Sequence, residues 1–135
     1  MSLNQEILRK AQGAFLLAHK MGLLDDASFE ALEKRRCEYN NSDHEYGPHY
    51  LSKEAYLFYE LTRLKLDFVL PTEEVKKTGL CPSFSEEERR EFFELNHDLF
   101  GRYHGDFFTF EEVSQIIEKR LREEAYDKLI EDILR

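Results

Sequence analysis

The sequence predicts an all-α fold, with about five to six helices around a central buried helix and a long C-terminal helix that packs back on the N-terminal lobe. Residues 52–70 are apolar on three sides of a helix at about 100° per residue, so this helix needs neighbours on three sides. Residues 110–134 form another long amphipathic stretch. The alternating pattern typical of strands is absent throughout the 135 residues.

The central helix has clear end signals and one charged strip. Ser52 is a good N-cap, and Pro71 ends the helix because proline disfavours helical geometry in the residue before it. The charged strip comprises Glu60, Arg63 and Asp67, whose spacing lets the arginine pair with both acids. We therefore expect an exposed ion-pair seam on this side of the helix.

The first helix is expected to span residues 4–21 and to end at Gly22, a common C-terminal stop. Its apolar face is unusually small in the middle, at Ala11, Ala14 and Ala18. Small side chains let another helix approach closely. This feature suits a bundle, and it also suits a self-association seam.

The second helix is expected to lie on the outside of the bundle. Either Asp25 or Asp26 caps it, and it runs to about Asn40 with few apolar and many charged side chains. Residues 41–51 then form a loop, because a Gly-Pro pair cannot continue a helix.

Capping signals place two further helices after the central one. Thr72 caps a short helix that runs to Lys77. Ser85 and Glu88 form a capping box for a helix that runs to Asn96. The side chains of this helix that we expect to face inward are Phe92, Phe93 and Leu95.

The last helix is predicted to change partners along its length. Thr109 and Glu112 form its capping box, and it runs from Phe110 to about Leu134. From Val113 onward its apolar side chains recur every four residues, so the stripe drifts by about 40° per step on a 3.6-residue helix. The first half must therefore face one partner, and the second half another.

Length and charge predict one helical domain, residues 1–135, without a nucleic-acid or membrane partner. The chain has 28 acidic and 19 basic side chains and a formal charge of −9, which disfavours binding to nucleic acid or anionic membranes. No segment approaches the roughly 20 apolar residues of a membrane span, and no signal peptide is visible. Cys37 and Cys81 are too few for a disulfide framework.

The histidines and cysteines do not match a metal site. Cys37, His44 and His49 lie close in sequence with Asp43 beside them, but their spacing matches no usual zinc pattern. Residues 97–112 superficially resemble a calcium-binding loop, but the register that keeps the glycine puts non-acidic side chains at ligand positions. Phosphate-loop, dinucleotide and nucleophile-elbow motifs are absent too. We therefore predict no metal, no cofactor and no catalytic residue.

Several aromatic side chains lie in loops or at helix starts, outside the regular apolar stripes. They are Tyr46, Tyr50, Tyr56, Phe107 and Phe108. Apolar rings beside polar residues are typical of a surface that binds other polypeptides, so these are the candidate client-binding residues. The alternative is that they fill gaps between short helices.

Four blocks of the sequence resemble the chaperone lobes of bacterial SurA- and PrsA-type foldases, which often carry a parvulin-type prolyl isomerase. The blocks are AHKMGLLDDASFEALEKRR, YGPHYLSKEAYLFYELTRLKL, FSEEERREFFELNHDLF and GDFFTFEEVSQIIEKRLREEAYDKLIEDIL. Only about a dozen residues separate Asn96 from Phe110, so the isomerase domain that stands between the last two blocks in the family is missing. The resemblance implies a helical peptide-binding lobe with an extracytoplasmic location and without enzymatic activity.

Three hypotheses follow. The first is a noncatalytic, chaperone-like domain that binds apolar segments of unfolded or partly folded polypeptides. The alternative is a self-association or assembly protein, a homodimer with exchanged helices that pairs through the alanine seam of the first helix. The least supported is an enzyme or metal protein that uses Cys37, His44 and His49.

Overall fold

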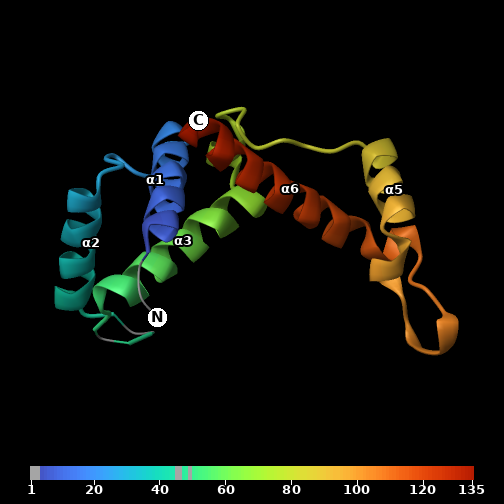
Figure 1. The fold of residues 1–135 in the computed structure, drawn as a ribbon, viewed down its shortest axis with the longest axis horizontal. Coiled ribbons are helices and arrows are strands. Elements are labelled where there is room, and N and C mark those ends of the chain that lie inside the picture. Colours follow the sequence, from blue (N-terminus) through green and yellow to red (C-terminus); the bar gives the residue numbers. More distant parts are fainter. Residues whose placement is uncertain (1–3, 45–46, 49) are drawn as a thin grey trace.

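The computed structural model describes residues 4–44, 47–48 and 50–135, and these residues form an all-α fold. Figure 1 shows an elongated molecule in which the long helix α6 (Phe110–Leu134) joins two lobes of unequal size. The C-terminal end of α6 packs against the N-terminal helices. The predicted fold class is therefore confirmed.

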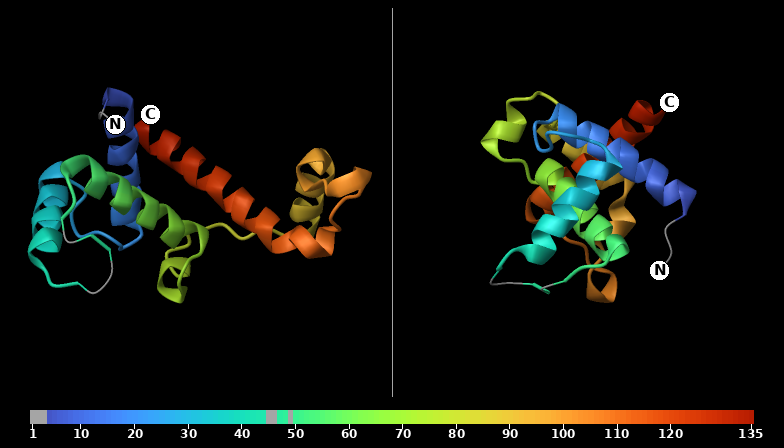
Figure 2. Two further views of the ribbon diagram at one scale, coloured as in Figure 1. Left: turned by 90° about the horizontal axis from the view of Figure 1, so that it is seen from below. Right: turned by 90° about the vertical axis from the view of Figure 1, so that its left-hand side faces the viewer.

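The larger lobe contains α1 (Gln5–Lys20), α2 (Phe29–Asn41), α3 (Lys53–Val69), the short α4 (Glu73–Lys76) and the second half of α6. Each of the first four begins with a side-chain cap that accepts a hydrogen bond from a first-turn amide, which satisfies one of the free amides at the helix start. The caps are Asn4, Ser28, Ser52 and Thr72. Figure 2 shows α2 on the outside of this lobe, as the sequence predicts.

The smaller lobe contains α5 (Glu86–Leu95), two 3₁₀ turns, η1 (His97–Phe100) and η2 (Tyr103–Gly105), and the first half of α6. The predicted capping boxes at the starts of α5 and α6 are both formed. The core of this lobe is aromatic and aliphatic, with Phe92 and Phe93 of α5 packed against it. Its buried members are Phe100, Phe110, Val113 and Ile117.

An extended segment, residues 77–85, joins the two lobes and is drawn in yellow in Figure 1. Arg122, near the middle of α6, contacts both this segment and the end of α3. Its guanidinium donates to the carbonyl oxygens of Pro82 at 3.3 Å and Val69 at 3.4 Å. One charged side chain thus ties the linker and the end of α3 to the helix that carries both lobes.

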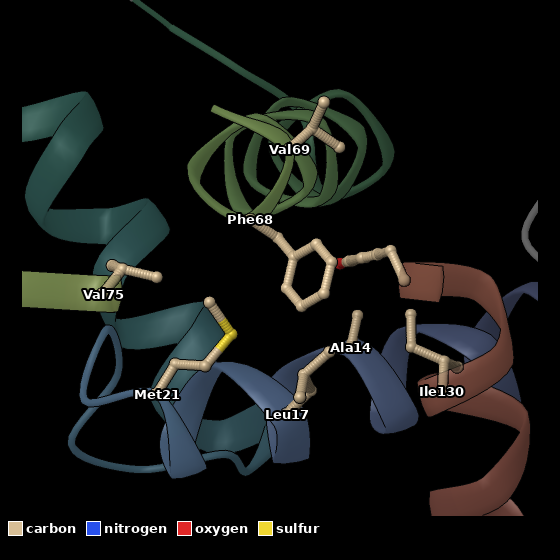
Figure 3. Packing of buried hydrophobic residues seen from close by; sticks show 8 residues of the cluster. Ala14, Leu17, Met21, Phe68, Val69, Val75 and Ile130 are labelled. Carbon is tan, nitrogen blue, oxygen red and sulfur yellow. The ribbon is translucent and has the colours of Figure 1, made fainter. Parts of the chain in front are cut away.

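The drift of the apolar stripe along α6 is confirmed, because the two halves of this helix bury different cores. Val113 and Ile117 belong to the core of the smaller lobe. Tyr126 and Ile130 belong to a core shared with α1 and α3. Figure 3 shows this second core, with Phe68 of α3 between the side chains that α1 and α6 contribute.

Helices α1 and α6 approach each other closely at Gly13. A methyl group added there would stand 2.7 Å from Ile130 Cγ2 and 3.1 Å from the Leu134 side chain. The alanines that the sequence singles out, Ala11, Ala14 and Ala18, are also buried inside this lobe. The small-residue face of α1 is therefore occupied by helices of the same chain.

Enlarging Gly13 is expected to force α1 and α6 apart. Gly13→Val should lower the free energy of unfolding by about 1 to 3 kcal/mol, as overpacking of a well-filled contact does. The measurement is a urea melt followed by circular dichroism. Gln12→Val, at the exposed neighbouring position, is the control. Equal stability of the two variants would contradict this close contact.

Three sequence predictions about these helices are wrong in detail. Helix α3 is not covered on three sides, because Tyr59, Leu66 and Leu70 are exposed. Helix α2 begins after Ser28, because Asp26 accepts a hydrogen bond from the Ser28 amide and so forms a turn ahead of the helix. Leu95 does not face inward, since 75% of its surface is exposed at the end of α5.

Candidate functional site

A groove lies in the larger lobe where α1, α3 and α6 meet. Its cavity volume is about 430 Å³. The lining residues are Lys10, Ala11, Ala14, Leu61, Lys65, Tyr126, Asp127, Ile130 and Glu131. Ala11, Ala14 and Ile130 are buried and form an apolar floor, whereas Lys10 and Asp127 are exposed and stand at the rim. Because the buried residues that α1 contributes here are the small Ala11 and Ala14, space remains between the three helices.

Tyr126, which carries a phenol hydroxyl, is among the residues that line this groove and is only 4% exposed. Its ring packs edge-on against Phe68, with 5.2 Å between the ring centroids. Burial, together with the charge of neighbouring Asp127, raises the pKa of Tyr126, so the phenol is neutral. The described residues provide no hydrogen-bond partner for this hydroxyl.

The rim of the groove carries two cations and two anions. Lys10 pairs with Glu6 at 3.7 Å, and Glu131 pairs with Arg9 at 3.8 Å. Lys65 and Asp127 form no ion pair with any residue that the structure describes. The groove therefore offers one uncommitted ammonium group, one uncommitted carboxylate and one phenol over an apolar floor.

A buried ion pair joins α2 to the middle of α3. Glu60 is only 6% exposed, and its two carboxylate oxygens accept from the Arg35 Nε at 3.1 and 3.0 Å. Burial works against the charge of Arg35, but the hydrogen bonds and charge of Glu60 outweigh it, and the pKa of Arg35 is raised. The predicted seam of Arg63 with Glu60 at the water-facing side is therefore wrong.

Of the five predicted site residues, the four that the structure describes do not form one surface. Tyr56 is buried, and burial with the nearby Glu60 carboxylate raises its pKa to about 12. Tyr50 is exposed in the larger lobe, with the Arg36 guanidinium over its ring. Phe107 and Phe108 lie in the smaller lobe and are partly exposed. Tyr46 lies outside the described residues.

The smaller lobe exposes more apolar surface than the sequence predicts. Its most exposed large apolar side chains are Leu95, Leu99, Tyr103 and Ile116. Tyr103 is 89% exposed, at the tip formed by η2. Exposed apolar side chains, where they lie together, are typical of a surface that packs against another polypeptide.

The histidines and cysteines singled out in the sequence are not gathered into a metal centre in the part of the chain that is described. Cys37 is exposed, and His44 Nε2 lies 2.7 Å from the carbonyl oxygen of Pro48. His49 lies outside the described residues. Across the described ranges, no group of three or more His, Cys, Asp and Glu side chains has the geometry to hold a metal ion, and no helix is long and apolar enough to cross a membrane.

Sequence reasoning missed the groove itself. Tyr126 lies in the second half of the last helix, which the sequence predicts to face a partner helix, and none of Tyr126, Lys65 and Asp127 was singled out as a site residue. The only local signal was a tyrosine, which carries a polar group, among aliphatic positions of the stripe. The other walls come from helices far away in the sequence.

No protein-family model and no curated protein sequence matches this chain. Among solved structures, the native crystal structure of a lacto-N-biosidase of glycoside hydrolase family 136 from Eubacterium ramulus is similar, with a TM-score of 0.76 and 28% sequence identity over 93% of this chain. The selenomethionine derivative of the same enzyme has a TM-score of 0.74 and 27% identity over 93% of this chain. In both comparisons this chain spans 27% of the length of the solved chain.

This likeness overturns the resemblance to SurA- and PrsA-type foldases and the chaperone function inferred from it. It also contradicts the prediction that the chain has no part in an enzyme, because the similar structures belong to a glycoside hydrolase. Self-association through exchanged helices is not supported either, since α6 of the same chain packs on the small-residue face of α1. The foldase blocks consist of capping boxes and amphipathic periodicity, which unrelated helical proteins share.

Proposed function

We propose that this chain is a helical part of a glycoside hydrolase that acts on lacto-N-biosides. The observation that carries the proposal is the structural likeness to the Eubacterium ramulus lacto-N-biosidase across 93% of this chain at 28% identity. A likeness that spans both lobes and the connecting helix involves the whole arrangement of the chain. It is therefore more than agreement between two short helical bundles.

In the proposed enzyme, the helical chain packs against the rest of the hydrolase through its smaller lobe. This lobe is built on the aromatic core beneath α5, yet Leu95, Leu99, Tyr103 and Ile116 stand on its outside. Burying such side chains against a partner is favourable by about 25 cal/mol per Å² of apolar surface. Aromatic and aliphatic groups at the centre of an interface with polar groups around it are the usual anatomy of such contacts.

The activity test uses the chain in the form in which its source produces it. The chain is tagged at its own locus, purified with whatever part of the enzyme accompanies it, and assayed with an aryl lacto-N-bioside whose aglycone is coloured when released. We expect lacto-N-biosidase activity to purify with the tag. Depleting the tagged chain should remove that activity from the extract.

A matched pair of variants tests the packing surface. Leu99→Glu with Tyr103→Glu should lower the recovered activity at least tenfold, because charges placed in an apolar interface weaken it by more than about 1.4 kcal/mol. Leu70→Glu, at an exposed leucine of the larger lobe, should leave the activity unchanged. The proposed function is contradicted if the purified chain and everything bound to it release no aglycone while depletion leaves the activity of the extract intact.

A further inference from the structure

The groove between α1, α3 and α6 has the form of a small-molecule site. Its volume of about 430 Å³ lies within the range of ligand pockets, which combine an apolar lining with a few well-placed polar groups. The apolar lining comes from Ala11, Ala14, Leu61 and Ile130, and the polar groups come from the tyrosine and the charged residues around it. The cavity walls come from three helices that pack against one another, so the site does not depend on a loop.

The Tyr126 hydroxyl is the group in this groove that most needs a partner. Every fully buried side-chain oxygen and nitrogen of the described residues has a hydrogen-bond partner. The Tyr126 hydroxyl has no partner, so it is not fully buried and keeps a small exposed surface. Tyr126 is one of the residues that line the groove, and 4% of its surface is exposed. A hydroxyl in such a place both donates and accepts hydrogen bonds.

The charges around the cavity favour a neutral ligand. The positive charges of Lys10 and Lys65 balance the negative charges of Asp127 and Glu131. An anion attracted by the lysines is therefore repelled by the carboxylates, and a cation attracted by the carboxylates is repelled by the lysines. A purely apolar ligand would cover the Tyr126 hydroxyl and leave it unpaired, which is costly. The ligand that satisfies all of these groups is neutral, carries several hydroxyl groups, and has apolar C–H faces for the alanine floor.

We propose that this groove binds a neutral saccharide, with hydrogen bonds from its hydroxyl groups to Tyr126, Lys65 and Asp127. Lysine supplies donors, the carboxylate supplies acceptors and the phenol supplies both, so the three groups together match the mixed character of sugar hydroxyls. The choice of lacto-N-biose as the saccharide to test rests on the proposed function. The binding of a neutral saccharide is inferred from the groove's own residues and does not depend on that function.

The test is a titration of the isotope-labelled chain with lacto-N-biose, in which NMR chemical shifts of the backbone amides are measured at each concentration. We expect shifts to change at residues 10–14, 61–65 and 126–131, around the groove. Tyr126→Phe removes only the hydroxyl, and it should weaken binding roughly fivefold, as the loss of one hydrogen bond does. Lys65→Met and Asp127→Asn should each weaken the binding of lacto-N-biose at least about fivefold.

Tyr59→Phe, which removes the hydroxyl of an exposed tyrosine on the uncovered side of α3, is the matched control and should leave the affinity unchanged. Circular dichroism verifies that each variant is folded. The inference is wrong if millimolar lacto-N-biose shifts no groove amide, or if folded Tyr126→Phe binds as tightly as the parent. Preference for glucuronic acid or glucosamine over neutral sugars would overturn the assignment of a neutral ligand.

The saccharide-binding test and the activity assay can reject their two proposals independently of each other. Saccharide binding in the groove without any lacto-N-biosidase activity in the purified enzyme would leave the groove standing and reject the proposed function. Activity that survives while the groove binds no saccharide would do the opposite.

Discussion

Replacing Phe68 with alanine is expected to lower the free energy of unfolding by about 3 to 5 kcal/mol, the usual cost of removing a buried aromatic ring. Phe68 has no exposed surface. It lies in the core of the larger lobe, where it meets α1 at Ala14 and Leu17 and the Tyr126 ring of α6. Because three helices converge on this ring, the cavity left behind cannot close by a shift of one neighbour.

The matched control is Leu66→Ala on the same helix. Leu66 is 47% exposed and faces away from the core, so its replacement should change stability by no more than about 0.5 kcal/mol. Urea melts of both variants, followed by circular dichroism, provide the comparison. Similar shifts of the two melting curves would mean that α3 presents a different face to the core.

Features that depend on a few neighbouring residues were predicted well from the sequence. Ser52, Ser85 and Thr109 cap the helices that their positions indicate, because a cap needs only one side-chain oxygen and the amides of the next turn. The change of partners along α6 was also predictable. A four-residue repeat must rotate around a 3.6-residue helix whatever the surroundings.

Features that depend on which helices meet were predicted poorly. Periodicity shows that α3 has several apolar sides, but it does not show that the side bearing Tyr59 and Leu66 stays uncovered. The groove could not be predicted for the same reason, because Lys65 and Asp127 line one cavity only once α3 and α6 have packed against each other. The foldase resemblance failed for a related reason, because capping boxes record helix starts and not the arrangement of helices.

Glu60 shows how much a partner from another helix changes the expected effect of a mutation. On an isolated α3, Glu60 and Arg63 are a surface pair, and such a pair contributes at most about 1 kcal/mol. In the folded chain Glu60 is buried under α2, where Arg35 of that helix donates to both carboxylate oxygens. The same residue is therefore expected to be one of the most sensitive polar positions.

Glu60→Ala is expected to lower the free energy of unfolding by about 3 kcal/mol, at the lower end of the range for breaking a buried ion pair because Arg35 keeps some contact with water. The loss arises mainly because the Arg35 guanidinium stays between α2 and α3 without its partner. Adding Arg35→Met to Glu60→Leu should therefore restore part of the stability, since it removes the unpaired charge and fills the space.

A second ion pair on α2, between Glu33 and Arg36, serves as the control for Glu60→Ala. Glu33 also accepts two hydrogen bonds from an arginine, Arg36, which lies one turn further along the same helix. The Glu33 side chain is 42% exposed, whereas that of Glu60 is 8% exposed. Glu33→Ala should have a smaller effect on the urea midpoint, because the carboxylate that it removes is partly solvated and Arg36 still donates to the carbonyl oxygen of Leu51. If Glu33→Ala and Glu60→Ala proved equally mild, the Arg35–Glu60 pair would not be buried between α2 and α3 in solution. If the double replacement at Arg35 and Glu60 were less stable than Glu60→Ala alone, the unpaired arginine would not be the cause of the loss.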